Sequence, residues 1–276
     1  MTQRDGSQTM VARLGKERNV EMPFLDHLEE LRWRIIWSLA ALVVSFVVGF
    51  WVMTQFNVLG LLIRPVQPYL PDGKLIYLSP ADPFMITVQL ALVIGLLLAF
   101  PVIAYQIWTF VSPALTREEK RAIVPALYLG LVLFAVGVTG AYYFVLPPTL
   151  RFFTMFQVEN LTPFLTAAGY FGLVTKLLLA FGAIFELPVV ILVLSALQLV
   201  TSAWLRSKRR YAIAGGAVIA ALITPGDVVS LTLFMMLPLM LLYEISIMLA
   251  WIVERRRRKV QLLEMRAAAE SLPEES

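Results

Sequence analysis

Cysteine is absent from the 276-residue chain, and histidine occurs once, at His27. These absences exclude a disulfide framework, a thiol nucleophile and a cysteine-ligated metal, and they leave no histidine for a serine–histidine–aspartate triad inside an apolar segment. The phosphate-binding pattern G-x-x-x-x-G-K-[ST] is absent as well. We therefore expect the chain to be no enzyme and to hold neither a cofactor nor a metal.

Charged residues are also scarce, at 15% of the chain, whereas soluble domains carry about a quarter. Hydrophobic residues make up 59%, and the mean hydropathy is +0.77. This composition is that of an all-α integral membrane protein. The basic residues form clusters between apolar segments, so membrane lipid is an expected partner and nucleic acid is not.

Six apolar segments are candidate transmembrane helices, which need about 20 residues each at 1.5 Å per residue. The predicted spans are about residues 35–53, 83–109, 122–146, 168–197, 211–223 and 228–252. The fifth contains only 13 residues. The last two segments are therefore either two short spans or one re-entrant hairpin.

The distribution of basic residues predicts the orientation of these spans. Nineteen lysines and arginines lie before the first span, in alternate loops or after the last span, whereas the other loops hold three and Lys176 lies inside a span. By the positive-inside rule, both termini are cytoplasmic and the number of spans is even. We expect a disordered extension over 1–21, one six-span membrane domain over 22–253, and a basic, then mixed-charge cytoplasmic tail over 254–276.

Two groups of carboxylates adjoin the cytoplasmic membrane surface. Residues 24–34, FLDHLEELRWR, predict an amphipathic helix that runs into the first span and gathers Asp26, Glu29 and Glu30 on one face, flanked by Arg32 and Arg34. A second pair, Glu118 and Glu119, lies in the loop after the second span. Carboxylates accept a guanidinium through two hydrogen bonds, so such clusters suit a cationic ligand and favour arginine over lysine. A solvated surface without function is the alternative.

Glu186 is the one carboxylate in the apolar stretch LLLAFGAIFELPVVILVL, residues 177–194. An ionised side chain at the centre of a membrane costs about 2.5–3.5 kcal/mol on insertion scales, so we expect a functional reason for it. A proton-coupled small-molecule transporter is one hypothesis, and a passive scaffold for other membrane proteins is another. The transporter would use the remaining polar residues of the spans, which are Lys176, Gln89, Thr139, Ser195 and Glu244.

Four stretches carry a resemblance to a known family: FLDHLEELRWR, AFPVIAYQIWTFVSPALTREEKR, FGAIFELPVV and ITPGDVVSLTLFMMLPLMLLYEI. In this order, from about residue 22 to 253, the chain resembles the C subunit of the twin-arginine protein translocase (TatC). The resemblance implies a glove-shaped, concave six-span fold. It also implies a multi-pass protein of a bacterial, archaeal or plastid-type cytoplasmic membrane.

The resemblance further implies a receptor for folded precursor proteins whose signal peptides carry an RR pair, with transport driven by the proton-motive force. Expected partners are small single-span A-type and B-type subunits and further copies of the chain. By carry-over, Glu30, Glu119, Phe110 and Arg32 form the signal-peptide site, with Glu118 beside Glu119. Glu186 is the family's intramembrane glutamate, and Asp227, Pro65 and Glu244 belong to a translocation or assembly group.

Overall fold

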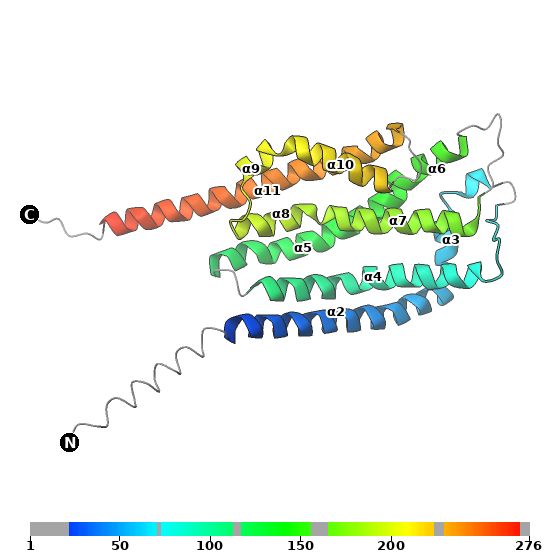
Figure 1. Ribbon diagram of the computed structural model, residues 1–276, viewed down its shortest axis with the longest axis horizontal. Coiled ribbons are helices and arrows are strands. Elements are labelled where there is room, and N and C mark those ends of the chain that lie inside the picture. The colour runs from blue at the N-terminus through cyan, green and yellow to red at the C-terminus, as the bar shows by residue number, and fades with distance from the viewer. Residues whose placement is uncertain (1–21, 71–72, 113–116, 156–164, 224–228, 271–276) are drawn as a thin grey trace, which may run out of the picture.

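The computed structural model describes residues 22–70, 73–112, 117–155, 165–223 and 229–270, which form a row of long helices (Figure 1). Within these ranges, five helical segments are long and apolar enough to cross a membrane: Leu28–Gln55, Asp82–Val111, Pro125–Met155, Ala167–Ala196 and Thr232–Leu263. A shorter helix, α10 (Arg209–Ile223), packs along the last of them and corresponds to the predicted short fifth span. The predicted all-α, six-span fold is confirmed.

The first and the last helix of the row have their terminal ends on the same side of the protein. The N-terminal end of α2 (Met22–Gln55) and the C-terminal end of α11 (Val229–Glu270) point the same way in Figure 1. The short helix α9 (Ser202–Ser207), with the basic residues that follow it, lies at this side too. We therefore call it the cytoplasmic end, and the opposite one the external end.

Three spans differ in detail from the predicted segments. The third comprises α5 (Arg117–Gly140), the π-helical turn η3 (Ala141–Val145) and α6 (Leu146–Met155). The fourth is divided at Glu186 into α7 (Ala167–Phe185) and α8 (Leu187–Ala196), because Pro188 has no N–H to continue the ladder of helical hydrogen bonds. The sixth is not short, since α11 runs for 42 residues, well past residue 252.

Helix α2 packs mainly against α4 (Asp82–Val111), and two glycines let their backbones meet closely. A Cβ added at Gly49 would lie 2.4 Å from the carbonyl oxygen of Ala91, and one added at Gly95 would lie 2.8 Å from Cα of Phe46. Small residues serve the same purpose in many transmembrane helix pairs, where close van der Waals packing drives association. This contact brings the backbones of α2 and α4 close together within the spans.

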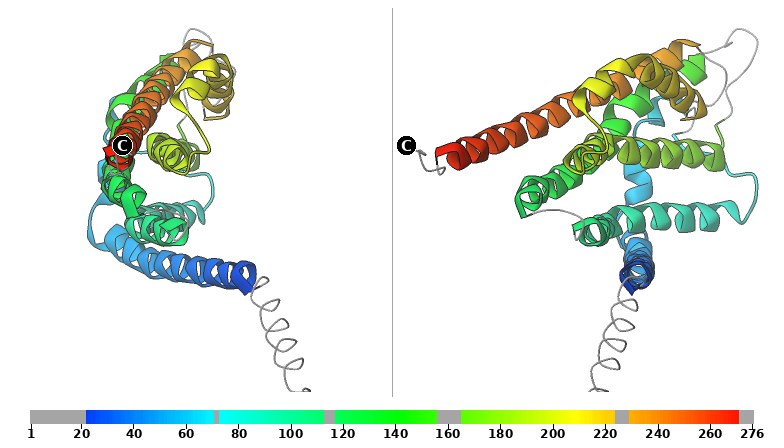
Figure 2. Two further views of the ribbon diagram at one scale, coloured as in Figure 1. Left: turned by 90° about the vertical axis from the view of Figure 1, so that its left-hand side faces the viewer. Right: turned by 60° about the vertical axis from the view of Figure 1, so that its left-hand side comes forward.

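The helices form a curved row instead of closing around one axis (Figure 2). The outer faces are apolar although they are exposed on the protein, as on α2, where Trp33, Trp37, Val43, Val44, Val47 and Trp51 are all more than half exposed. Side chains of this kind are stable against lipid tails. The exposed apolar surface therefore agrees with a multi-pass membrane protein.

Two tyrosines form hydrogen bonds with the segment that connects α2 to α4 at the external end of the protein. This segment contains α3 (Val58–Ile63) and the 3-10 turn η1 (Gln67–Tyr69). Pro65, half-buried just after α3, cannot donate to the carbonyl of Leu61 as a helical residue there would. The hydroxyl of Tyr142 donates to that carbonyl at 2.6 Å, and the hydroxyl of Tyr170 donates to the carbonyl of Leu62. Pro65 thus adjoins a turn that the third and fourth spans hold in place.

Candidate functional site

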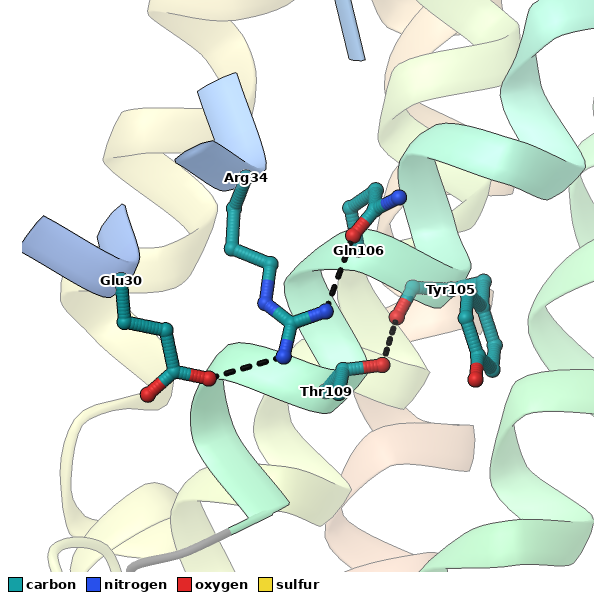
Figure 3. Close-up of polar contacts among 5 residues, drawn as sticks. All are labelled: Glu30, Arg34, Tyr105, Gln106 and Thr109. Carbon is teal, nitrogen blue, oxygen red and sulfur yellow. Dashed lines mark hydrogen bonds and ion pairs between the residues drawn. The ribbon is translucent and has the colours of Figure 1, made fainter. Parts of the chain in front are cut away.

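A guanidinium–carboxylate pair on α2 is hydrogen-bonded to α4 at the cytoplasmic end (Figure 3). Arg34 donates from Nη2 to Oε1 of Glu30 at 2.8 Å, and from Nη1 to Oε1 of Gln106 at 3.1 Å. The side chains of Arg34 and Glu30 are 26% and 32% exposed, so both are partly withdrawn from water. We call Glu30, Arg34 and Gln106 the α2–α4 site.

Helix periodicity places Glu30 and Arg34 together, because residues four apart lie one above the other on a helix surface. Arg34 lies on the face of α2 that contacts α4, to which Phe46 and Gly49 also belong. On α4, the side-chain hydroxyl of Thr109 donates to the carbonyl of Tyr105 at 2.8 Å and stays within its own helix (Figure 3). Gln106 is therefore the α4 side chain that reaches across to Arg34.

The sequence predicted Glu30 but missed two of its neighbours. In the sequence, Arg34 only flanks the acidic face, and no pattern points to Gln106. The i,i+4 spacing of Glu30 and Arg34 is a signal that could have revealed the pair. Gln106 is a polar residue near the cytoplasmic end of an otherwise apolar span, which is a weaker signal, since its partner lies 72 residues away in the chain.

The structure describes the side chains of two of the other predicted signal-peptide residues. Arg32 is exposed on α2, and Phe110 is half-buried near the end of α4. Glu119 belongs to the first turn of α5, but the side chains of Glu118 and Glu119 lie outside the described residues. Their place in the site stays a prediction.

Glu186 lines an apolar pocket of about 280 Å³ between α4, α5 and α8. Its neighbours in the pocket include Phe100 and Trp108 from α4, Leu127 from α5 and Val190 from α8. Oε1 of Glu186 is buried and has no hydrogen-bond partner among the described residues. A buried acceptor of this kind is costly to leave unpaired, so the pocket is suited to a ligand that brings a hydrogen-bond donor.

Gly130 on α5 makes room for the Glu186 carboxylate, since a Cβ added there would lie 2.9 Å from Oε2. We expect Gly130→Ala to lower the thermal stability of the purified protein by a few degrees, because the carboxylate must move. Glu186→Ala should remove most of that loss in the double variant. Gly140→Ala is the matched control, because a Cβ there meets nothing within 4 Å. Equal melting temperatures for the two glycine variants would contradict this arrangement.

Two residues predicted for translocation or assembly lie far apart in the chain and have different surroundings. Glu244 on α11 accepts a hydrogen bond from Nη2 of Arg209 at 2.7 Å, and both side chains are about half exposed. Pro65 adjoins the external turn described above. Asp227 lies outside the described residues. The described residues thus do not bring this predicted group together.

The polar residues that a small-molecule transporter would need are dispersed. Gln89 donates to the hydroxyl of Thr175 at 3.0 Å, and Lys176 is exposed on α7. Thr139 lines a separate, larger apolar cavity of about 740 Å³ between α5, α7 and α11. Ser195 is buried. Within the described part of the chain, none of them lines the Glu186 pocket, which disfavours a polar solute there.

Comparisons with known proteins agree with this architecture. A family model described as "Sec-independent protein translocase protein (TatC)" matches residues 26–238. A Sec-independent protein translocase protein TatC from Aquifex aeolicus is 39% identical over 87% of this chain and 99% of its own, and one from Koribacter versatilis is 35% identical over 91% and 94%. A crystal structure of the twin arginine translocase receptor TatC matches with a TM-score of 0.72 at 40% identity, covering 83% of this chain and 99% of its own.

Proposed function

The chain belongs to the TatC family of Sec-independent protein translocases, and on that basis we propose that it is a receptor for twin-arginine signal peptides. In this role it would bind the RR pair of a precursor at the cytoplasmic membrane and organise export of the folded protein. The observation that carries the proposal is the α2–α4 site. There, Glu30 already holds one guanidinium, from Arg34, at 2.8 Å.

The chemistry of the site suits an arginine ligand. A carboxylate accepts a guanidinium through two parallel hydrogen bonds, whereas a lysine ammonium acts as a point charge. We propose that Glu30 and Glu119 contact the two arginines, with Phe110 and Arg32 at the edge of the same surface. Glu118, next to Glu119, offers a second carboxylate to the same arginine.

The apolar stretch after the RR pair would have a place to bind close by. Helix α4 presents Gln106 to α2, while the adjacent Ile107 and Trp108 line the Glu186 pocket. A peptide bound at Glu30 could therefore extend along α4 toward an apolar pocket with one buried hydrogen-bond acceptor. We propose that a signal peptide, or the helix of a partner subunit, supplies the donor to Glu186.

A curved wall of six spans is too small to enclose a folded protein. We therefore propose that transport requires partners, namely small single-span A-type and B-type subunits and further copies of this chain. The proton-motive force would supply the energy, as membership of the family implies, and the lack of a P-loop in the sequence agrees with this.

The test is complementation of a bacterial strain that lacks its own C subunit. We expect this chain, produced with matching A-type and B-type subunits, to restore export of a folded fluorescent protein that carries an RR signal. A reporter with a KK signal should stay in the cytoplasm. Export of both reporters alike, or of neither while the chain is present in the membrane with its partners, would contradict the proposal.

A further inference from the structure

We propose that Arg34 is an intramolecular competitor for the arginines of the signal peptide. Its guanidinium occupies Glu30 in the unbound protein, and a ligand must displace it to bind. This inference rests on the proposed receptor function and adds to it a residue that sets the threshold for binding. Because of this competition, a guanidinium of the ligand displaces Arg34 from Glu30, whereas a lysine ammonium does not.

The geometry of the pair is the first support. The contact between Arg34 Nη2 and Glu30 Oε1, at 2.8 Å, is the same kind of contact that an arginine of a ligand would make. Arg34 engages Glu30 through Nη2 while Nη1 donates to Gln106 (Figure 3). Its fork is thus divided between two partners, whereas a ligand guanidinium can direct two parallel donors at the carboxylate.

Gln106 is the second support, because it gives the displaced guanidinium a partner. Arg34 can release Glu30 and keep its bond to the Gln106 carbonyl oxygen on α4. The side chains of Arg34 and Glu30 are about a quarter and a third exposed, so water can reach the contact during the exchange. A pair that only reinforced α2 would have no need of a third residue on another helix.

The exchange predicts that a ligand binds Glu30 only if its contact with the carboxylate is stronger than that of Arg34. A ligand guanidinium forms a stronger contact with Glu30 than Arg34 does, so displacement is favourable. A lysine ammonium offers no bidentate contact and is strongly hydrated, so it does not replace Arg34. A KK peptide should then bind no better than a peptide with two neutral residues, because both would attach only through their apolar stretches.

The experiment measures the affinity of the full-length chain, in lipid nanodiscs, for three signal peptides that differ only in the pair RR, KK or QQ. We expect the wild-type chain to bind RR best and to bind KK and QQ within about twofold of each other. Arg34→Gln should tighten RR binding about three- to tenfold, between the values for a solvated helix pair and a charged hydrogen bond. It should also make KK bind clearly better than QQ.

Two further variants separate displacement from other effects. Arg206→Gln removes one exposed positive charge from the same end of the protein and should leave KK and QQ equal. Gln106→Leu keeps Arg34 and changes no charge, but it frees Nη1 of Arg34, so that both donors of the guanidinium can turn to Glu30 and compete more strongly with the ligand. As a single substitution, Gln106→Leu should weaken RR binding severalfold. Added to Arg34→Gln, it should weaken RR binding by less than twofold.

Weaker RR binding by Arg34→Gln, in protein that melts like the wild type, would overturn the inference and make Arg34 part of the binding surface. KK binding well above QQ in the wild-type chain would also overturn it. If Arg34→Gln does not fold, unchanged RR binding by Gln106→Leu overturns it instead. Failure of the receptor function is recognised separately, as a wild-type chain with no RR preference, or as a preference that Glu30→Lys leaves intact.

Discussion

Glu30→Lys is expected to abolish the preference of the chain for twin-arginine signal peptides and to weaken their binding at least about 30-fold. Losing one partner of a partly buried charge pair costs about 2–5 kcal/mol, and the new ammonium also repels the ligand. The measurement is peptide affinity by fluorescence anisotropy in nanodiscs, together with export of an RR reporter in cells. If Glu30 binds an arginine of the signal peptide, this variant should lose both peptide binding and reporter export.

Glu29→Lys is the matched control for this result. Glu29 is the adjacent carboxylate on the same helix and is exposed, so its reversal makes the same change of charge outside the α2–α4 site. We expect its effect on RR affinity to stay within about threefold, as for other exposed charges. Equal losses for the two variants would show that only the overall negative charge of the surface matters.

Gly49→Leu is expected to separate α2 from α4 and to destroy the same binding site from a distance. A Cβ at this position would lie 2.4 Å from the carbonyl oxygen of Ala91 and 2.9 Å from the amide nitrogen of Gly95, and these are backbone atoms that cannot turn away. Overpacking of this kind costs about 1–3 kcal/mol, and occasionally more. We expect a lower melting temperature in detergent and a loss of RR binding.

Val48→Leu controls for the added bulk. Val48 neighbours Gly49 on α2 but is exposed, so a larger apolar side chain there meets lipid. Its melting temperature and RR affinity should match those of the wild type. If Gly49→Leu also melts and binds like the wild type, the close contact of α2 with α4 does not position Glu30 and Gln106.

The membrane fold could be predicted from the sequence because hydropathy alone marks the spans. Both faces of a span lie in an apolar medium, so the segments around Trp37 or Val93 are recognised without knowing their neighbours. The positive-inside rule then predicted that both termini lie on one side of the membrane, and Figure 1 shows the start of α2 and the end of α11 at the same end of the helical row. What hydropathy does not encode is where a helix bends or ends. The break at Glu186 follows from Pro188, while the extension of α11 through Arg255–Arg258 follows from residues with good helix propensity that lie beyond the membrane segment.

The site could be predicted only in part, for a different physical reason. The acidic cluster of Asp26, Glu29 and Glu30 stands out locally on one face of an amphipathic helix, and the resemblance to the TatC family singles out Glu30 among them. The contact of Arg34 with Gln106, in contrast, depends on how closely α2 approaches α4, and that approach depends on Gly49 and Gly95. Gly130, which lines the pocket, likewise leaves room for the Glu186 carboxylate because it has no side chain. Such consequences of packing cannot be read from residue types along one helix.

The α2–α4 site and the Glu186 pocket adjoin opposite sides of one helix end. Gln106 on α4 reaches Arg34, and Trp108, two residues later, lines the pocket. A ligand that displaces Arg34 from Glu30 would therefore act on the same segment of α4 that forms a wall of the pocket. In this account, recognition of the RR pair and binding of the apolar stretch are two contacts of one peptide with one helix end.

The most direct test of the central claim is the affinity of the wild-type chain, purified and reconstituted in nanodiscs, for a signal peptide with RR against the same peptide with KK. We predict that RR binds at least about tenfold more tightly, as expected when bidentate hydrogen bonds to a carboxylate replace a point charge. Equal affinities for RR and KK would contradict the account, because the carboxylates of this surface would then not distinguish guanidinium from ammonium.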